Sequence, residues 1–246
     1  MVRIIGLLVF IALVTGCESV GSDHIKTSGV YARLLAQDTK DTSGNDVQVK
    51  VELLVGGASS NTYLDTKNTG DTVNISRNGV SRTAIRNKGI LGDVYYTYSF
   101  GSATGEDVFT VDFSRLDGVS APSSTVTMPQ VFSIANSATT FDISDNNTIN
   151  FIYTPTDFSS FGSVSYRIDG DCINTFSGNL NIASGSLSIS ANNLGSLIAG
   201  PNEVVPSACA ITASFTHTNS GSIDAAFGGG KFTANRDVDI AMTIQE

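Results

Sequence analysis

The stretch Val47-Gln48-Val49-Lys50-Val51-Glu52-Leu53-Leu54-Val55 carries an apolar side chain at every second position. One face holds Val47, Val49, Val51, Leu53 and Val55, and the other holds Gln48, Lys50 and Glu52. A period of two is typical of a β-strand that buries one side and exposes the other. The stretch therefore predicts a half-buried strand, and its alternation is the clearest in the chain.

Shorter segments of the same kind surround this strand and are separated by turn residues. We expect further strands over 29–36, 62–65, 71–76, 80–85, 94–100 and 109–113. Asn78-Gly79, between two of them, is a strong signal for a type I′ hairpin turn. About seven short strands with frequent turns predict a first β-sandwich over residues 28–118.

The second half of the chain repeats this pattern after an interruption. Val119-Ser-Ala-Pro-Ser-Ser-Thr125 breaks the alternation and predicts a linker over 119–129. Strand patterns resume at Val131 and end with 238–244, which predicts a second sandwich over 130–246. The count and spacing of strands resemble the immunoglobulin-like fold. This resemblance implies an all-β protein with two tandem antiparallel sandwiches.

The N-terminus has the organisation of an export signal. Met1-Val2-Arg3 precedes an apolar run over 4–14, which is too short for the roughly 20 residues of a membrane-spanning helix. Val14-Thr15-Gly16-Cys17 then resembles the lipobox of bacterial lipoproteins. The resemblance implies a signal peptide over 1–16 and acylation of Cys17, so that membrane lipid is a partner. Residues 17–27 are polar and are expected to form a lipidated tether.

The residue after Cys17 is Glu18 and not Asp. In the lipoprotein family, Asp at this position often marks retention in the inner membrane. The resemblance therefore implies a lipid anchor in the outer membrane, with either the periplasmic or the surface face open as a location.

Two further cysteines remain once Cys17 is assigned to lipid. An exported protein with an even pair of cysteines most simply forms a disulfide, here between Cys172 and Cys209. Cys209 has the strand parity of Ile211 and Phe215, which predicts that it faces the core. A redox-active pair is the less favoured reading, because such cysteines are usually close in sequence.

Composition argues against several classes of function. Asp and Glu total 23 against 14 Lys and Arg, a net charge of −9, which repels nucleic-acid backbones. The two histidines, His24 and His217, are too few for a histidine-based zinc site, and no nucleophile elbow occurs. We therefore predict no catalytic residue, metal or cofactor. A hydrolase using scattered carboxylates is a third hypothesis, because sequence does not reveal their separation.

Tyr95, Tyr96 and Tyr98 form the one aromatic cluster that suggests binding. Tyr95 is a candidate for stacking on a sugar ring. The structural alternative places Tyr96 and Tyr98 in the core and makes Tyr95 a corner residue whose hydroxyl binds backbone. The sequence thus predicts a non-enzymatic envelope protein with a binding, adhesion or scaffolding role, whose partner is an unknown envelope protein or glycan. The alternative is a carbohydrate-binding accessory module.

Overall fold

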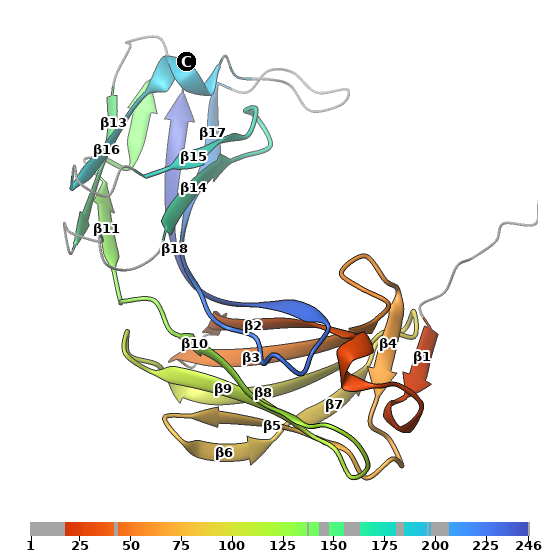
Figure 1. The fold of residues 1–246 in the computed structure, drawn as a ribbon. Coiled ribbons are helices and arrows are strands. Elements are labelled where there is room, and N and C mark those ends of the chain that lie inside the picture. The colour runs from red at the N-terminus through yellow and green to blue at the C-terminus, as the bar shows by residue number, and fades with distance from the viewer. Residues whose placement is uncertain are drawn as a thin grey trace, which may run out of the picture.

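The computed structural model describes residues 18–41, 44–136, 138–142, 148–154, 163–180, 185–195, 197 and 207–245. These residues form β-strands and short 3₁₀ turns, arranged as two lobes at an angle to each other (Figure 1). The protein is an all-β sandwich protein, as the sequence predicted. In the part of the chain described, no helix has the length and apolar character needed to cross a membrane.

Each lobe encloses its own hydrophobic core, and we name the lobes N-terminal and C-terminal. The N-terminal lobe contains β1 (Glu18–Gly21), β2 (Val30–Asp41), β3 (Gly44–Val55), β4 (Thr62–Asp65), β5 (Thr72–Arg77), β6 (Val80–Thr83), β7 (Ile85–Lys88), β8 (Val94–Ser102), β9 (Val108–Ser114) and β10 (Ala121–Thr127), with the 3₁₀ turns η1 (Ser22–His24) and η2 (Thr27–Gly29). The C-terminal lobe contains β11 (Ser133–Asn136), β12 (Thr140–Asp142), β13 (Thr148–Thr154), β14 (Ser163–Asp169), β15 (Phe176–Asn179), β16 (Ser186–Ser190) and the turn η3 (Ala191–Leu194). Two longer strands, β17 (Ala208–Ser220) and β18 (Gly229–Gln245), belong to both lobes.

The N-terminal lobe packs part of one 11-stranded sheet against a four-stranded sheet, β10-β9-β5-β6. The predicted inward residues of β3 from Val47 to Leu53 are at most 1% exposed, and they face the buried aromatic residues of β9. Leu54 departs from the alternation and is also buried, at the position where β3 pairs with β4 (Leu54–Tyr63). The alternation that defines this strand therefore holds from Val47 to Leu53.

The hairpin between β5 and β6 has the predicted turn. Asn78 and Gly79 have φ angles of 50° and 81°, and Arg77 pairs with Val80 on either side of them. Two successive residues in the left-handed region are what a type I′ turn requires. The Asn-Gly signal is therefore confirmed.

The C-terminal lobe packs the other part of the large sheet against a three-stranded sheet, β11-β13-β16. Phe151 on β13 meets Phe215 on β17 edge-to-face, with ring centroids 5.0 Å apart. Cys172 and Cys209 form the predicted disulfide at this core, with Cα atoms 6.3 Å apart. A bridge between two segments separated by 37 residues holds the chain before β15 to the start of β17.

The hairpin of β17 and β18 connects the two cores through a ladder that runs from Ala208–Gln245 to Ser220–Thr233. The first half of β18 pairs in parallel with β2, and its last residues pair in parallel with β12. Residues 227–234 thus contribute to the first core, although the sequence assigned all of 130–246 to a second domain. Local alternation predicts a strand but not which of two cores the strand faces.

The segment predicted as a linker over 119–129 is largely a strand. Residues Ala121–Thr127 form β10, which pairs with β9 and shifts register between Ala121 and Ser124. Pro122 lies at this irregularity, where a strand tolerates a residue without an N–H group. The linker prediction is therefore wrong for these residues, because proline and small residues here belong to a bulged strand. The connection between the lobes is the short stretch after Thr127.

The segment predicted as a tether over 17–27 lies against the N-terminal lobe from residue 18 onward. Strand β1 pairs in parallel with β4, from Glu18–Thr62 to Gly21–Asp65. Arg115 then donates hydrogen bonds to the carbonyl oxygens of Ser22 and Ile25. A polar four-residue strand has no amphipathic pattern, and its partners are distant in sequence, so the local sequence did not indicate this packing.

A buried ion pair lies where the large sheet passes from one lobe to the other. Arg236 Nη1 on β18 is 2.9 Å from Asp38 Oδ2 on β2, and both side chains are 6% exposed. Arg236 also donates to the carbonyl oxygens of Pro129 and Ala103, whereas Asp38 Oδ1 has no hydrogen-bond partner among the described residues. Burial raises the pKa of Asp38 from 3.8 to about 6, against the opposing effect of Arg236, and Asp237 raises it further.

We predict that Arg236→Met destabilises the protein strongly at pH 7. Removing one partner leaves a buried carboxylate without its cation, which costs about 3–5 kcal/mol. Adding Asp38→Asn removes that charge, so the double variant should be more stable than Arg236→Met alone. Urea unfolding followed by circular dichroism measures the difference, and equal stability of the two variants would contradict this account.

The same pair has a pH signature. Because the pKa of Asp38 is higher in the folded protein than its ordinary value of 3.8, this group favours folding below that value, and its contribution is lost as pH rises through about 6. Asp38→Asn should therefore flatten the pH dependence of unfolding between these two values.

We predict that the disulfide stabilises the folded protein by restricting the unfolded chain. A loop of 37 residues corresponds to about 4 kcal/mol on the chain-entropy model. Replacing Cys172 and Cys209 together by Ser should lower the free energy of unfolding by that order, measured by denaturant titration. Two reactive thiols in the native exported protein would show that the bridge is absent.

Candidate functional site

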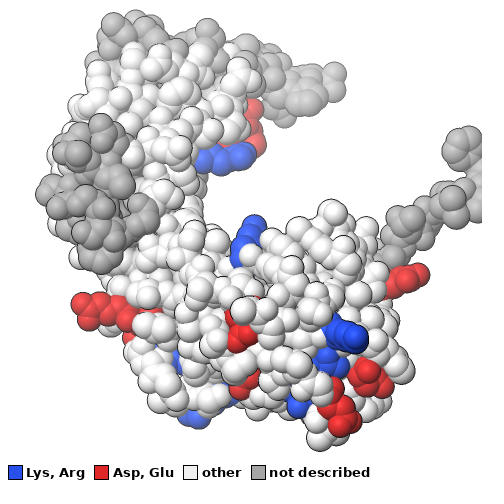
Figure 2. All heavy atoms as spheres, viewed as in Figure 1, with Lys and Arg blue, Asp and Glu red and all other residues white. Residues whose placement is uncertain are grey.

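The outer face of the large sheet runs through both lobes and lines the concave side of the molecule (Figure 1). Figure 2 shows this side as a deep hollow with basic atoms on both of its arms. A row of paired residues crosses six neighbouring strands of the sheet: Ser163, Thr218, Asn235, Gln37, Gln48 and Ser99. Every member of the row is polar and uncharged, so this surface offers hydrogen bonds across its width.

The N-terminal arm of the hollow carries a basic patch, which we define as Arg33, Lys50, Glu52 and Lys231. Arg33 pairs with both Glu52 and Lys231 across neighbouring strands. Glu52 accepts from Arg33 Nη1 at 3.1 Å and lies 2.7 Å from Lys50 Nζ, whereas Lys231 is exposed. Three cations around one carboxylate give a local excess of positive charge on a protein whose net charge is −9.

The C-terminal arm is more polar than charged. Arg167 and Asp169 on β14 form an ion pair, and Thr175 Oγ1 donates to Asp169 Oδ1 at 2.7 Å. Hydrogen bonding from Arg167 and from Thr175 holds the pKa of Asp169 below its usual range. A shallow depression of about 490 Å³ beside this pair is lined mainly by hydroxyl and amide side chains of β14, β15 and β17.

Tyr95, the predicted ligand-binding residue, lies half-buried on the concave face of β8. The Lys50 ammonium group lies over its ring, 4.7 Å from the ring centroid. A sugar that stacks on this side of the ring has to displace the Lys50 side chain. The structure therefore places Tyr95 on the candidate surface, and its role in binding stays a prediction.

The hydroxyl that binds backbone belongs to Tyr96 and not to Tyr95. Tyr96 is 1% exposed, and its hydroxyl donates to the Leu64 carbonyl at 3.0 Å and accepts from the Thr66 N–H at 2.9 Å. Burial raises the pKa of Tyr96 above its ordinary value. The hydroxyl–backbone contact expected for Tyr95 is thus made by the next residue, Tyr96, because Tyr96 reaches β4 from the inner face of β8.

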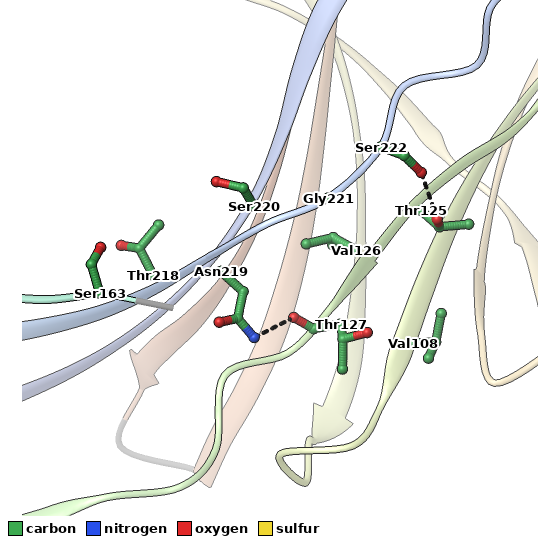
Figure 3. A pocket seen from close by; sticks show the side chains of 10 residues that line it. All are labelled: Val108, Thr125, Val126, Thr127, Ser163, Thr218, Asn219, Ser220, Gly221 and Ser222. Carbon is green, nitrogen blue, oxygen red and sulfur yellow. Dashed lines mark hydrogen bonds between the residues drawn. The ribbon is translucent and has the colours of Figure 1, made fainter. Parts of the chain in front are cut away.

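A second hollow of about 880 Å³ lies at the junction between the lobes (Figure 3). Thr125 and Ser222 share a hydrogen bond of 3.0 Å at one end, and Asn219 donates to the Thr127 carbonyl at 3.1 Å in the middle. Its lining residues are Val108, Thr125, Val126, Thr127, Ser163, Thr218, Asn219, Ser220, Gly221 and Ser222. None of them is charged, so this hollow suits neutral hydrogen-bonding groups. Sequence reasoning missed it because its walls come from segments about 100 residues apart.

Cys17, the predicted lipidation site, lies outside the described residues. His217 is fully buried, with Nδ1 3.4 Å from the Gln130 carbonyl and its ring against Phe132, so it serves the packing between the lobes. Among the described residues, no group of three or more His, Cys, Asp or Glu side chains could hold a metal ion.

Comparison with known proteins gives no family. No family model matches the chain, and no curated protein matches it. Among solved structures, the chain is similar to the FN1–FN3 domains of chicken CNTN1, with 10% identity and a TM-score of 0.31, over 87% of this chain and 69% of that one. It is also similar to the adhesin InvE of Yersinia pseudotuberculosis, with 12% identity and a TM-score of 0.21, over 87% of this chain and 60% of that one. At these values neither similarity supports a statement about function.

Proposed function

We propose that this protein is a lipid-anchored, non-enzymatic protein of the cell envelope that binds a partner on the concave face of its large sheet. The observation that carries the binding role is the unbroken outer face shared by the two lobes. The anchor rests on Cys17 and the export signal before it. Glu18 favours the outer membrane as the location.

The concave face has the chemistry of a recognition surface. Its central row supplies hydroxyl and amide groups on six adjacent strands, which suits an extended partner that presents its own hydrogen-bonding groups in sequence. The basic patch beside the row favours an acidic segment of the partner, since charge complementarity steers association. Arg33, Tyr95 and Tyr31 on this face are of the residue types enriched at protein interfaces.

A protein partner is favoured over a glycan by the arrangement around Tyr95. Sugar-binding sites use open aromatic faces, and the Lys50 ammonium group already lies over this ring. Arginine and tyrosine on one surface are residue types enriched at protein interfaces. The carbohydrate-binding accessory role is the alternative, and it requires the Lys50 side chain to swing away.

We predict that Cys17→Ala releases the protein from membranes. Without the thiol no acyl chain can be attached, and the mature form should be recovered in the soluble fraction or should accumulate as precursor. Membrane fractionation with and without globomycin measures this, and metabolic labelling with palmitate checks acylation. Membrane fractionation of Cys17→Ala at the size of the processed protein would contradict the lipid anchor.

We predict that reversing the charge at the rim of the concave face reduces partner recovery. Lys231→Glu replaces an exposed cation of the basic patch, and a loss of about 1.4 kcal/mol would lower binding about tenfold. Crosslinking in intact envelopes, followed by quantitative mass spectrometry of the same captured protein, measures the change. Lys67→Glu is the matched control, because Lys67 is also exposed but lies on the loop after β4.

Equal capture by Lys231→Glu and wild type, together with capture lost in Lys67→Glu, would place the binding surface elsewhere. Specific signals on a glycan array that strengthen in Lys50→Ala would instead support the carbohydrate-binding alternative.

A further inference from the structure

Two loops of the N-terminal lobe hold the four most exposed large apolar side chains among the described residues. Ile90 and Leu91, in the turn between β7 and β8, are 104% and 69% exposed. Leu116 and Val119, in the loop between β9 and β10, are 69% and 68% exposed. Large, exposed apolar side chains in loops gain free energy on entering an apolar phase.

The second loop is bonded directly to the N-terminal segment, and the first loop is linked to it through β4. The carboxylate of Asp65, which pairs with Gly21 of β1, accepts two hydrogen bonds of 2.6 Å from Arg86 of β7, shortly before the first loop. The second loop is held by Thr27 Oγ1, which donates to the Val119 carbonyl. Figure 1 shows β1, β4 and the end of β7 at the end of the N-terminal lobe that is remote from the C-terminal lobe.

The second loop is also held by Arg115. This side chain is 3% exposed, lies 3.2 Å from Asp71 and donates to the carbonyl oxygens of Ser22 and Ile25. Leu116 then lies against Gly70 in the loop after β4. The loop with Leu116 and Val119 is therefore positioned by the segment that begins at Glu18.

The predicted acylation site is separated from the folded lobe by a very short length of chain. Cys17 directly precedes Glu18, whose N–H donates to the Asn61 carbonyl at 3.2 Å as β1 pairs with β4. One residue of extended chain spans at most about 3.6 Å. An acyl chain attached at Cys17 thus brings this end of the lobe to the headgroups.

We infer that the loops carrying Ile90, Leu91, Leu116 and Val119 insert into the bilayer that holds the acyl chains, and so orient the protein on its membrane. This inference rests on the proposed lipid anchor. Asp117 lies in the second loop itself, between the two apolar residues, and Asp23 and Lys26 lie beside that loop. These groups carry both signs of charge, so insertion depends on contact of the apolar side chains and not on anionic lipid. Inserted apolar side chains add to the membrane affinity that the acyl chains supply. The C-terminal lobe and the concave face then stand away from the membrane.

The chain contains no tryptophan, which makes a direct test available. Leu91→Trp and, separately, Val119→Trp introduce a single fluorophore into each loop, and Ile152→Trp on the C-terminal lobe is the matched control at an exposed site. The full acylated protein is reconstituted into phosphatidylcholine vesicles with brominated acyl chains. We expect a blue-shifted emission and at least twofold quenching for both loop variants, and neither change for Ile152→Trp.

Flotation of the same vesicles measures membrane attachment of the protein, and the tryptophan emission measures insertion of the loops, so the two are tested separately. If the protein floats but both loop variants keep water-exposed, unquenched emission, the inference is overturned and the anchor stands. If the protein does not float, the proposed anchor and the inference both fail. A blue shift that depends on protein concentration and needs no vesicles would overturn the inference in favour of contact between two copies of the chain.

Discussion

The hairpin of β17 and β18 is the constraint on which the rest of the structure depends. Its ladder of paired residues runs from one lobe into the other, and its two ends belong to different cores: Phe232 lies in the first and Ile244 in the second. Main-chain hydrogen bonds along one continuous ladder resist bending and sliding more than a flexible linker would. The two sandwiches are therefore parts of one sheet that passes between them, and the angle between them is built into that sheet.

This continuity gives the concave face its character. Between the two cores, the inner face of the sheet packs against neither set of apolar side chains. Asp38, Arg236 and His217 lie there as buried polar groups. Arg236 reaches Pro129 and Ala103, so it also fastens the connecting chain to the hairpin. The outer face needs no such adjustment. It continues across six strands as a row of hydroxyl and amide side chains, which is why a binding surface can extend over both lobes.

The N-terminal segment connects the proposed membrane attachment to the folded N-terminal lobe. Residues that follow the predicted acylation site are held by β4 and by Arg115, whose side chain is almost fully buried. A flexible tether would let the lobes adopt any orientation above a bilayer. Here the short segment after the predicted acylation site includes β1, which belongs to the large sheet. The attachment point therefore has a set position relative to the concave face. In our proposal, attachment and recognition are thus opposite ends of one rigid arrangement.

The sequence by itself determined the strands that have a clear alternation, one hairpin turn and the disulfide, because each is encoded locally or by simple counting. Alternation at Val47–Leu53 predicts a strand, Asn78-Gly79 predicts its turn type, and a leftover pair of cysteines predicts a bridge. The same local signals could not show that Pro122 lies in a bulged strand or that Phe232 returns to the first core. They also placed the corner hydroxyl on Tyr95, one residue from Tyr96, which reaches the backbone of β4. Only the tertiary structure decided the shared sheet, the concave row and the position of the N-terminal segment, since each depends on pairing between residues far apart in the chain, and a period of two is the same whichever neighbour a strand acquires.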